Sequence, residues 1–229
     1  MAKSQFTLDR SDDPCPLLPV EAGPHDRGVG EWVPNSKHTY LAKYIEGTHA
    51  MRARWPNRVY VDLFCATGRI RVDGEAFTRP GSAPLAWVHS NRHSAPFTKC
   101  IVGDADPSRA RACGDRLRAL GSPVVVLEGQ ASDTAGRVLA EVPRGALTTV
   151  FLDPYNLAYL SFEVIKKLSR LGRVDFAVHF STMDLQRNVD MELDDARARF
   201  DDAAPGWRTN IPVNTLSKTA LRQEFFAYW

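Results

Sequence analysis

The tripeptide Asp153-Pro154-Tyr155 is the most specific chemical feature of this sequence. A carboxylate and a backbone carbonyl can accept the two hydrogens of an amine on a planar ring, while an aromatic side chain lies beneath the ring. Positioning of this kind removes much of the barrier to attack by a weak nucleophile. We therefore assign Asp153, Pro154 and Tyr155 to a candidate catalytic loop. The alternative is an Asp-Pro pair that only ends a strand and begins a turn.

A second run, DLFCATG (62–68), forms a turn of small residues. It has one glycine where a dinucleotide fingerprint needs three, and the chain has no GxxxxGK phosphate loop, so nicotinamide, flavin and ATP sites are disfavoured. Such a turn suits a nucleoside-like cofactor with an amino-acid tail, of which S-adenosylmethionine is the common example. The candidate cofactor residues of this turn are Asp62, Phe64, Cys65, Ala66, Thr67 and Gly68.

Two further loops carry candidate cofactor residues. Asp104 follows an apolar run and could accept hydrogen bonds from both ribose hydroxyls, or it could be a simple turn carboxylate. Asp106 precedes Pro107 and is expected to cap a helix. Gln130 follows the next apolar run, where it either contacts an adenine amino group or is an exposed loop residue.

Apolar runs and helical periods alternate along the chain from residue 35 onward. The expected strands are 58–64, 99–103, 123–129, 146–153 and 174–180. The expected helices are 35–56, capped by Asn35 or Ser36, and then 82–92, 107–120, 132–142 and 161–171. This alternation predicts an α/β fold with a mostly parallel sheet and helices on both faces. Ligands bind beyond the carboxyl ends of such strands, where the candidate loops lie.

The composition is that of an ordinary globular chain: 229 residues, 44% hydrophobic and 24% charged, with a net charge of +2. We expect an irregular N-terminal arm over 1–34, rich in proline and glycine, and one domain over 35–229. The four cysteines lack the paired spacing of a zinc site, so we expect free thiols in the cytoplasm and no metal. No signal peptide or membrane span is predicted.

Several other polar residues have competing interpretations. Lys37 and His38 could reach the substrate or a cofactor carboxylate, but solvent exposure is favoured. His179, at the end of the fifth predicted strand, is a candidate base or a hydrogen-bonded core residue. Cys65 could be a nucleophile, although a small buried packing residue is strongly favoured.

Charge is unevenly distributed along the chain. An arginine excess between residues 52 and 79 could meet phosphates of a nucleic acid, whereas the later segment is acidic. The arginines are Arg52, Arg54, Arg58, Arg69, Arg71 and Arg79, and the acidic residues are Asp190, Glu192, Asp194, Asp195, Asp201 and Asp202. A charged solvated face explains both runs about as well.

Several motifs together resemble the three-Cys-motif partner protein (TcmP) family over residues 36–229. The resemblance is carried by YVDLFCATGRI (60–70), PGSAPLAW (80–87), GDAD (103–106), VFLDPYN (150–156), DFAVHFSTMDLQR (175–187) and PGW (205–207). It implies a class I S-adenosylmethionine-dependent methyltransferase fold, with Gly81 and Ser82 also lining the cofactor turn, and a protein partner bearing a three-cysteine motif. Two positions depart from the family: CATG replaces AGPG, and the aspartate expected near Gln130 is absent.

The leading hypothesis is thus a methyltransferase whose acceptor is an amine of a nucleobase or another nucleophile. The alternative is a non-catalytic cofactor-binding or interaction component of a two-protein system, to which the CATG turn and the missing aspartate point. The sequence predicts five strands. A methyltransferase sheet normally has two more, which follow the fifth strand in the chain. The resemblance therefore predicts either a sheet that lacks this strand pair or a sheet closed in another way.

Overall fold

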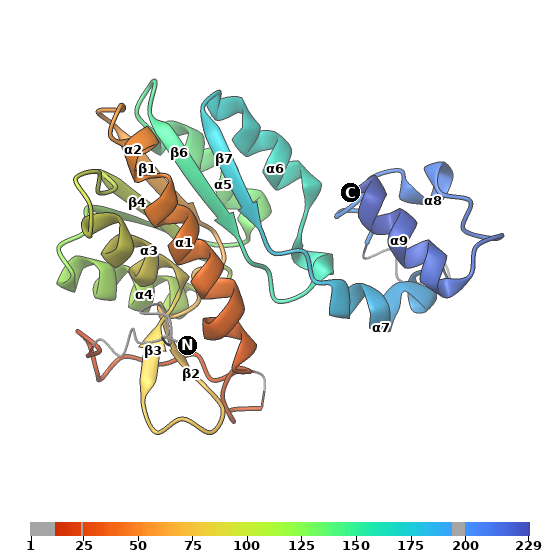
Figure 1. The fold of residues 1–229 in the computed structure, drawn as a ribbon, viewed down its shortest axis with the longest axis horizontal. Helices are drawn as coiled ribbons and strands as arrows, with labels where there is room; N and C mark the ends of the chain where they lie inside the picture. Colours follow the sequence, from red (N-terminus) through yellow and green to blue (C-terminus); the bar gives the residue numbers. More distant parts are fainter. Residues whose placement is uncertain (1–11, 24, 194–199) are drawn as a thin grey trace.

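The computed structural model describes residues 12–23, 25–193 and 200–229 (Figure 1). All five predicted runs form strands of one parallel sheet with the order β5-β4-β1-β6-β7. The strands are β1 (Arg58–Asp62), β4 (Lys99–Asp104), β5 (Val124–Glu128), β6 (Leu147–Leu152) and β7 (Val174–Val178). The strand order reverses between β1 and β6, which is where an open α/β sheet forms a crevice. The chain is therefore a Rossmann-like α/β protein.

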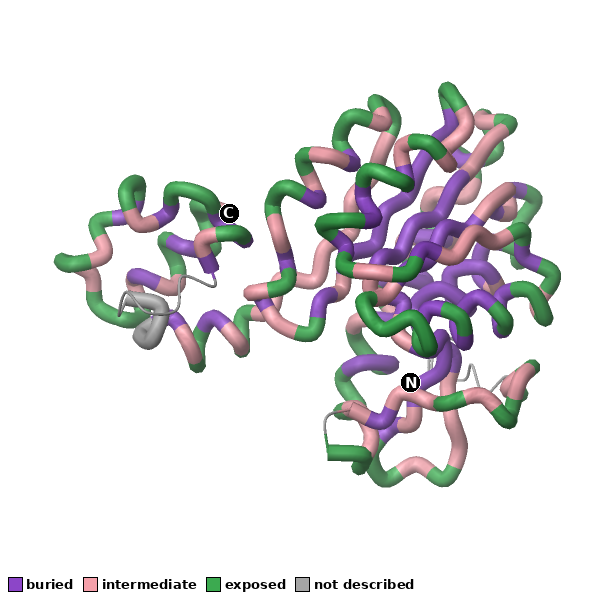
Figure 2. Tube along the Cα trace, turned by 180° about the vertical axis from the view of Figure 1, so that it is seen from behind, coloured by how far each residue is buried: buried purple, intermediate pink, exposed green. Residues whose placement is uncertain are grey.

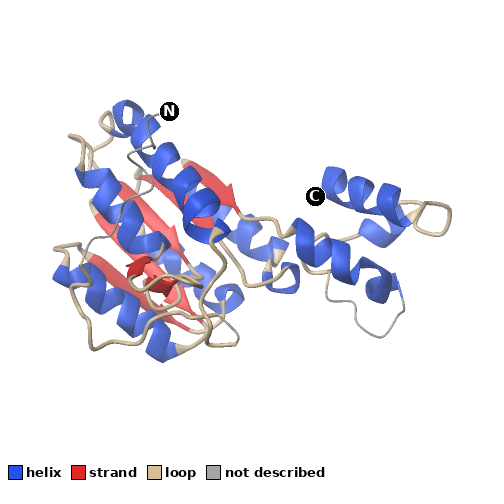
Figure 3. Ribbon diagram, turned by 60° about the horizontal axis from the view of Figure 1, so that its bottom comes forward, coloured by secondary structure: helices blue, strands red, loops and turns tan. Residues whose placement is uncertain are grey.

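Helices cover both faces of this sheet because alternate strand residues point to opposite sides (Figure 3). Tyr60 packs in one apolar cluster with residues of α1 (Thr39–Gly47), α3 (Ser82–Asn91) and α4 (Pro107–Ala119). Val59 and Val61 pack in the other cluster with residues of α5 (Ala131–Glu141) and α6 (Phe162–Leu168). Figure 2 shows the buried strands between these layers. Each fully buried aliphatic side chain stabilises the fold by about 1.5–3 kcal/mol.

The helix predicted over 35–56 is divided into three pieces. A π-helical segment, η2 (Val33–His38), leads into α1, and α2 (His49–Arg52) follows after Thr48. Neither Asn35 nor Ser36 caps it, since the helix begins two residues earlier with Pro34 in its first turn. Within α1, Leu41 and Ile45 lie four residues apart on the buried face of the helix, whereas Tyr40 is exposed.

The connection over 62–82 contains a hairpin that the sequence analysis did not predict. Strands β2 (Arg69–Arg71) and β3 (Thr78–Pro80) pair antiparallel, and Gly74 adopts a positive φ of 76° in the turn between them. Two residues of the N-terminal arm, Glu21 and Val29, form isolated bridges to this hairpin. Each strand has only three residues, and β2 has an arginine at both ends. The alternation of apolar and polar residues is therefore too short to identify the hairpin from the sequence.

The arm is anchored by a buried arginine of α4. The Arg116 guanidinium donates to both carboxylate oxygens of Asp13, at 2.9 and 2.8 Å. It also donates to the carbonyl of Pro19 in the arm and to the carbonyl of Thr67 in the turn after β1. Burial would raise the pKa of Asp13, but the hydrogen bonds and charge of Arg116 hold it below its usual value. The arm and the turn are thus held by one side chain.

The chain after β7 is helical in the residues that the structure describes, so the C-terminal strand pair is not found there. Helices α7 (Thr182–Leu193), α8 (Trp207–Asn210) and α9 (Lys218–Tyr228) extend away from the sheet (Figure 1). Trp207 and Phe225 are buried where α8 and α9 meet, with their rings 5.0 Å apart in a T-shaped contact. The short 3-10 segments η3 (Leu157–Tyr159) and η4 (Ser169–Leu171) complete the fold. In the described residues, none of the helices is long and apolar enough to cross a membrane.

Candidate functional site

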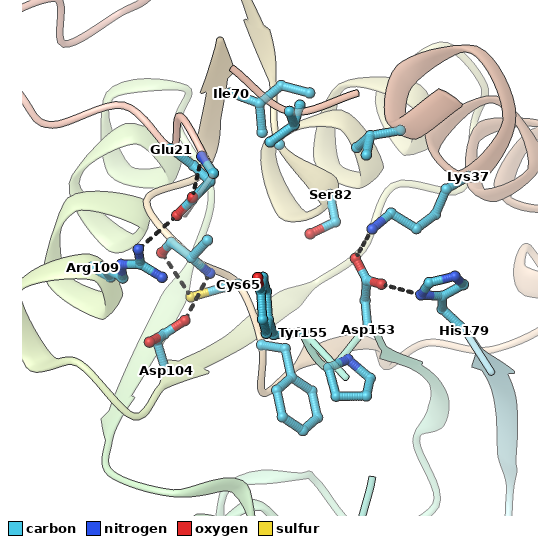
Figure 4. A pocket seen from close by; sticks show the side chains of 18 of the residues that line it. Glu21, Lys37, Cys65, Ile70, Ser82, Asp104, Arg109, Asp153, Tyr155 and His179 are labelled. Carbon is cyan, nitrogen blue, oxygen red and sulfur yellow. Dashed lines mark hydrogen bonds and ion pairs between the residues drawn. The ribbon is translucent and has the colours of Figure 1, made fainter. Parts of the chain in front are cut away.

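A cavity of about 520 Å³ opens at the carboxyl edge of the sheet, beside the switch between β1 and β6 (Figure 4). Its walls come from the turn after β1, from the loops after β4, β5, β6 and β7, and from the arm and η2. The candidate site residues that line it are Phe64, Cys65, Ala66, Gly68, Gly81, Ser82, Asp104, Gln130, Asp153, Pro154 and Tyr155. Its volume lies within the usual range for small-molecule sites, about 300–1,000 Å³.

Two of the predicted cofactor residues do not line the cavity. Asp62 is fully buried beneath the turn, where it accepts hydrogen bonds from Ser82 Oγ at 2.5 Å and from the Phe64 amide at 3.0 Å. Thr67 is buried too, because its Oγ1 donates to the Arg69 carbonyl and accepts from the Glu21 amide. Both side chains satisfy backbone groups of the turn rather than facing a ligand. Burial raises the pKa of Asp62 to about 7.

The turn itself is held by backbone hydrogen bonds to β4. The Cys65 amide donates to the Gly103 carbonyl at 2.9 Å, and the Ala66 amide donates to Asp104 Oδ2 at 3.1 Å. Ala66 adopts a positive φ of 47°, a conformation that only a tightly constrained turn imposes on alanine. Cys65 is buried, and burial raises the pKa of its thiol well above the ordinary value. A protonated, enclosed thiol is a packing group rather than a nucleophile.

Gly68 and Gly81 bring the start of α3 against the turn. The Gly81 amide donates to the Gly68 carbonyl at 2.9 Å, although a hairpin separates them in sequence. A Cβ on Gly81 would lie 2.9 Å from the Gly68 carbonyl carbon, and Gly68 has a positive φ of 74°. Only glycine at both positions permits this close approach.

Asp104 and Gln130 lie on the same side of the cavity as the turn. Asp104 accepts the Ala66 amide on one oxygen and the Asp106 amide on the other, and burial raises its pKa. Each carboxylate oxygen keeps a second lone pair for a ligand hydroxyl. Asp106 caps α4 as predicted, accepting from the Ser108 amide at 2.8 Å. Gln130 is exposed at the start of α5.

On the other side of the cavity, the Asp153 carboxylate lies between the Lys37 ammonium and the His179 ring (Figure 4). Lys37 Nζ lies 2.5 Å from Oδ2, and His179 Nδ1 lies 2.9 Å from Oδ1. Burial would raise the pKa of Asp153, but contact with His179 and Lys37 holds it below its usual value. The favoured interpretation of Lys37 as solvated was wrong, since its side chain is 15% exposed. His38 is also buried, which lowers its pKa to about 4.

Aromatic side chains border this side of the cavity. Tyr155 is 73% exposed and Tyr159 and Trp32 are exposed as well, although all three contribute to the cavity wall. The Trp32 ring lies 5.6 Å from the His179 ring and 5.1 Å from Lys37 Nζ. Sequence reasoning did not single out Trp32 or Tyr159. Trp32 gave no signal because it lies in the arm, and Tyr159 follows Tyr155 by four residues in a segment without a clear period.

Glu21 and Arg109 also line the cavity and were missed. Glu21 Oε2 lies 3.0 Å from Arg109 Nη2, so this ion pair joins the arm to the first turn of α4 beside Asp104. The position of Arg109 five residues after Asp104 was the available signal, because the first turn of α4 must begin at this edge of the sheet. Nothing in the sequence connects Glu21 to it.

The arginines of residues 52–79 do not form a phosphate-binding patch at the cavity mouth. Arg52 is buried, and Arg58 donates to the Pro96 carbonyl at 2.6 Å near the amino end of β1, the opposite edge of the sheet. Arg69 lines the cavity but donates to Thr78, Arg71 contacts Asp26, and Arg79 contacts Glu75. Arg54 is exposed. Most of these guanidinium groups are therefore engaged by the protein rather than gathered at the cavity mouth.

The predicted acidic segment lies mainly where no side chains are described. Asp194 and Asp195 fall outside the described residues, and nothing is said of the side chains of Asp190 and Glu192. Asp201 accepts hydrogen bonds from Trp207 Nε1 and Arg208 Nε, at 2.7 and 2.9 Å. This carboxylate therefore holds the segment before α8 to the first turn of α8.

The fold and this cavity define a Rossmann-like α/β protein with a candidate small-molecule site at the switch point of its sheet. No family model matches the chain, and no curated protein matches it. All four cysteines are free, and the described residues contain no group of three side chains that could hold a metal ion.

Proposed function

We propose that this protein is an S-adenosylmethionine-dependent methyltransferase. The observation that carries the proposal is that one cavity joins the turn after β1 to the Asp153-Pro154-Tyr155 loop after β6. We call the Phe64–Gly68 turn, Asp104 and Gln130 the cofactor side. We call Lys37, Asp153, Tyr155 and His179 the acceptor side. A cofactor and an acceptor placed on these two sides would share one cavity.

The donor and acceptor groups of the cofactor side fit S-adenosylmethionine. Asp104 offers carboxylate lone pairs for the ribose hydroxyls, and Gln130 offers an amide for the adenine edge. The small side chains of Cys65 and Ala66 and the bare backbone of Gly68 leave room for the rest of the molecule. When bound, this cofactor supplies an electrophilic methyl group on a sulfonium.

Asp153 has an orienting role in this proposal, not the role of a base. Its depressed pKa keeps it ionised, and an ionised carboxylate of low pKa is a weak proton acceptor. Its oxygens are already in contact with Lys37 and His179, so an amine acceptor would have to share or displace one of these partners.

Isothermal titration calorimetry of the full chain with S-adenosylmethionine and with its demethylated product tests the proposal. Wild type is expected to bind both. Asp104→Asn should weaken binding by roughly 10- to 100-fold, because a charge-assisted hydrogen bond is lost. The control is Asp133→Asn, on the exposed face of α5, which should bind as wild type does. No binding of either compound to folded wild type would rule the function out.

A second candidate is a non-catalytic cofactor-binding component that acts with a partner bearing a three-cysteine motif. The Lys37–Asp153 ion pair favours it, since it occupies the carboxylate that would contact an acceptor. An Asp153→Ala protein that keeps the cellular function would support this candidate and contradict the catalytic one. Loss of the cellular function with cofactor binding intact would support catalysis.

A further inference from the structure

The acceptor side contains a charged cluster that cofactor binding does not explain. Lys37 comes from η2, Asp153 from the loop after β6, and His179 directly follows β7. Lys37 Nζ lies 2.5 Å from one carboxylate oxygen of Asp153, and His179 Nδ1 lies 2.9 Å from the other. All three line the cavity, and the carboxylate at their centre is 13% exposed. Bringing a lysine, an aspartate and a histidine out of water has a cost that a mere packing role would not offset.

The two nitrogens of His179 have different surroundings. Nδ1 is buried and lies 2.9 Å from Asp153 Oδ1, in an ion-pair contact whose angles are not those of a hydrogen bond. Nε2 makes no hydrogen bond within the described part of the chain. A carboxylate beside Nδ1 favours the tautomer with its proton on Nδ1, which leaves the lone pair on Nε2. Because the side chain is 28% exposed and lines the cavity, this lone pair is accessible to a bound molecule.

From this geometry we propose that His179 is the proton acceptor of the methyl transfer and that Asp153 and Lys37 position it. The methyl acceptor is then a weakly acidic hydroxyl on a planar ring. This inference rests on the proposed function and replaces its amine acceptor. A neutral amine needs no base before attack, since its proton leaves afterwards, whereas a hydroxyl must lose its proton as it attacks. The nearby Lys37 ammonium favours the negative charge that develops on oxygen.

The aromatic border of the cavity supplies the argument for a planar ring. Trp32 and Tyr155 are 46% and 73% exposed, and both line the cavity. Trp32 precedes η2 and its ring lies 5.6 Å from the His179 ring, while Tyr155 is two residues after Asp153 in the loop after β6. Exposed aromatic side chains at a cavity stabilise a planar ligand by stacking, and each such contact contributes specificity. An aliphatic acceptor could not stack on these rings.

The step balances in atoms and charge. The hydroxyl proton moves to His179 Nε2, and the oxygen forms a bond to the methyl carbon. The bond from that carbon to the sulfonium sulfur breaks, and its electron pair remains on sulfur as a neutral thioether. The imidazolium then releases its proton to water. The net products are the methyl ether, the demethylated cofactor and one proton.

The test uses a matched pair of probes, 1-naphthol and 1-naphthylamine, with S-adenosylmethionine and the purified full chain. Mass spectrometry should detect the methyl ether of 1-naphthol, with 1-naphthylamine methylated at least about 10-fold more slowly. The rate should rise with pH through one ionisation. The charged or titratable groups facing His179 are Asp153 on its Nδ1, with Lys37 and His38 beyond that carboxylate.

His179→Gln should lower this rate by roughly 100-fold or more and abolish its pH dependence, with an unchanged Kd for S-adenosylmethionine. His93→Gln is the control, because His93 is exposed and stacks only on His49 away from the cavity. Added imidazole should partly restore the rate of His179→Gly, which a purely structural role would not allow. Equal transfer to the amine, transfer to neither probe, or a fully active His179→Gln would overturn the inference.

Nitrogen-15 NMR of histidine-labelled protein provides a measurement that needs neither cofactor nor acceptor. The expected spectrum at pH 8 has the His179 proton on Nδ1, and Asp153→Asn should reduce this preference. A proton on Nε2 in wild type would overturn the inference. Failure of wild type to bind S-adenosylmethionine would instead contradict the proposed function, while the tautomer would still report how His179 is oriented.

Discussion

The two sides of the cavity are built in different ways. On the cofactor side, backbone amides hold the turn. The amides of Cys65 and Ala66 donate hydrogen bonds to the end of β4, and the Gly81 amide donates one to the Gly68 carbonyl. On the acceptor side, charged side chains from separate elements hold one another, with Asp153 between Lys37 and His179. The first arrangement depends on close packing and the second on ionisation. Steric substitutions should therefore damage one side, and pH or charge changes should alter the other.

Arg116→Met should have the largest effect, because Arg116 holds the arm against the cofactor side. Its removal leaves the Asp13 carboxylate without its partner and should lower the free energy of unfolding by about 3–5 kcal/mol. Urea denaturation measures the change. Arg118→Met, on the same helix but in an exposed pair with Asp115, should cost at most about 1 kcal/mol. Similar losses in both variants would show that the arm is not held in this way.

Gly81→Ala tests whether the cofactor side is packed to its limit. The new methyl would meet backbone atoms of Gly68, which cannot move as a flexible side chain could, so a loss of about 1–3 kcal/mol is expected. S-adenosylmethionine binding should weaken as well. Gly136→Ala, in the exposed interior of α5 with open space around it, should instead stabilise by about 0.5–1 kcal/mol. If Gly81→Ala left the free energy of unfolding unchanged, the turn would have to be able to move to accommodate the methyl group.

Asp62→Asn tests the carboxylate buried beneath the cofactor side. The pKa of Asp62 is about 7 in the folded state and about 3.9 in an unfolded chain, so the folded state binds more protons between these values. The free energy of unfolding of wild type should therefore fall as pH rises from about 4 to 7. Asparagine does not ionise, so this fall should shrink by about 1 kcal/mol or more. Denaturation curves at pH 4, 6 and 8 would show it, and an unchanged slope would contradict it.

Lys37→Met should have the smallest effect on stability but a clear effect on ionisation. Without the ammonium, one of the two charges that oppose the effect of burial is lost, so the pKa of Asp153 should rise. In wild type the depressed pKa stabilises the fold above about pH 4, and this gain is lost as pH falls through the folded value. The variant should lose part of that gain. Carbon-13 NMR of the Asp153 carboxyl measures the pKa, and Lys166→Met, at an exposed position of α6, should leave it unchanged.

The sheet was predictable from the sequence because each strand is a contiguous apolar run. The structure shortens the first run, 58–64, to Arg58–Asp62 and changes the ends of the others by at most two residues. The helix before β1 was less predictable, because a π-helical segment precedes α1 and the helix is interrupted at Thr48. The hairpin over 69–80 was missed because its strands are only three residues long.

The candidate site shows the same division. The loops after β1, β4 and β6 could be placed at one edge because parallel strands end together, and they do line one cavity. The same reasoning could not separate Ala66, which faces the cavity, from Asp62 and Thr67, which lie beneath it. That distinction depends on which hydrogen bonds each side chain makes across the turn.

The sequence by itself determined the order of strands and helices, the edge at which ligands would bind, and the chemical character of its loops. These follow from local patterns, in which neighbouring residues act together. Only the tertiary structure decided that Lys37 and His179 meet at Asp153 and that Arg116 holds the arm to the turn after β1. It also decided that most arginines of residues 52–79 contact the protein itself. Such contacts join residues far apart in the chain, and their geometry depends on the register and packing of the whole fold.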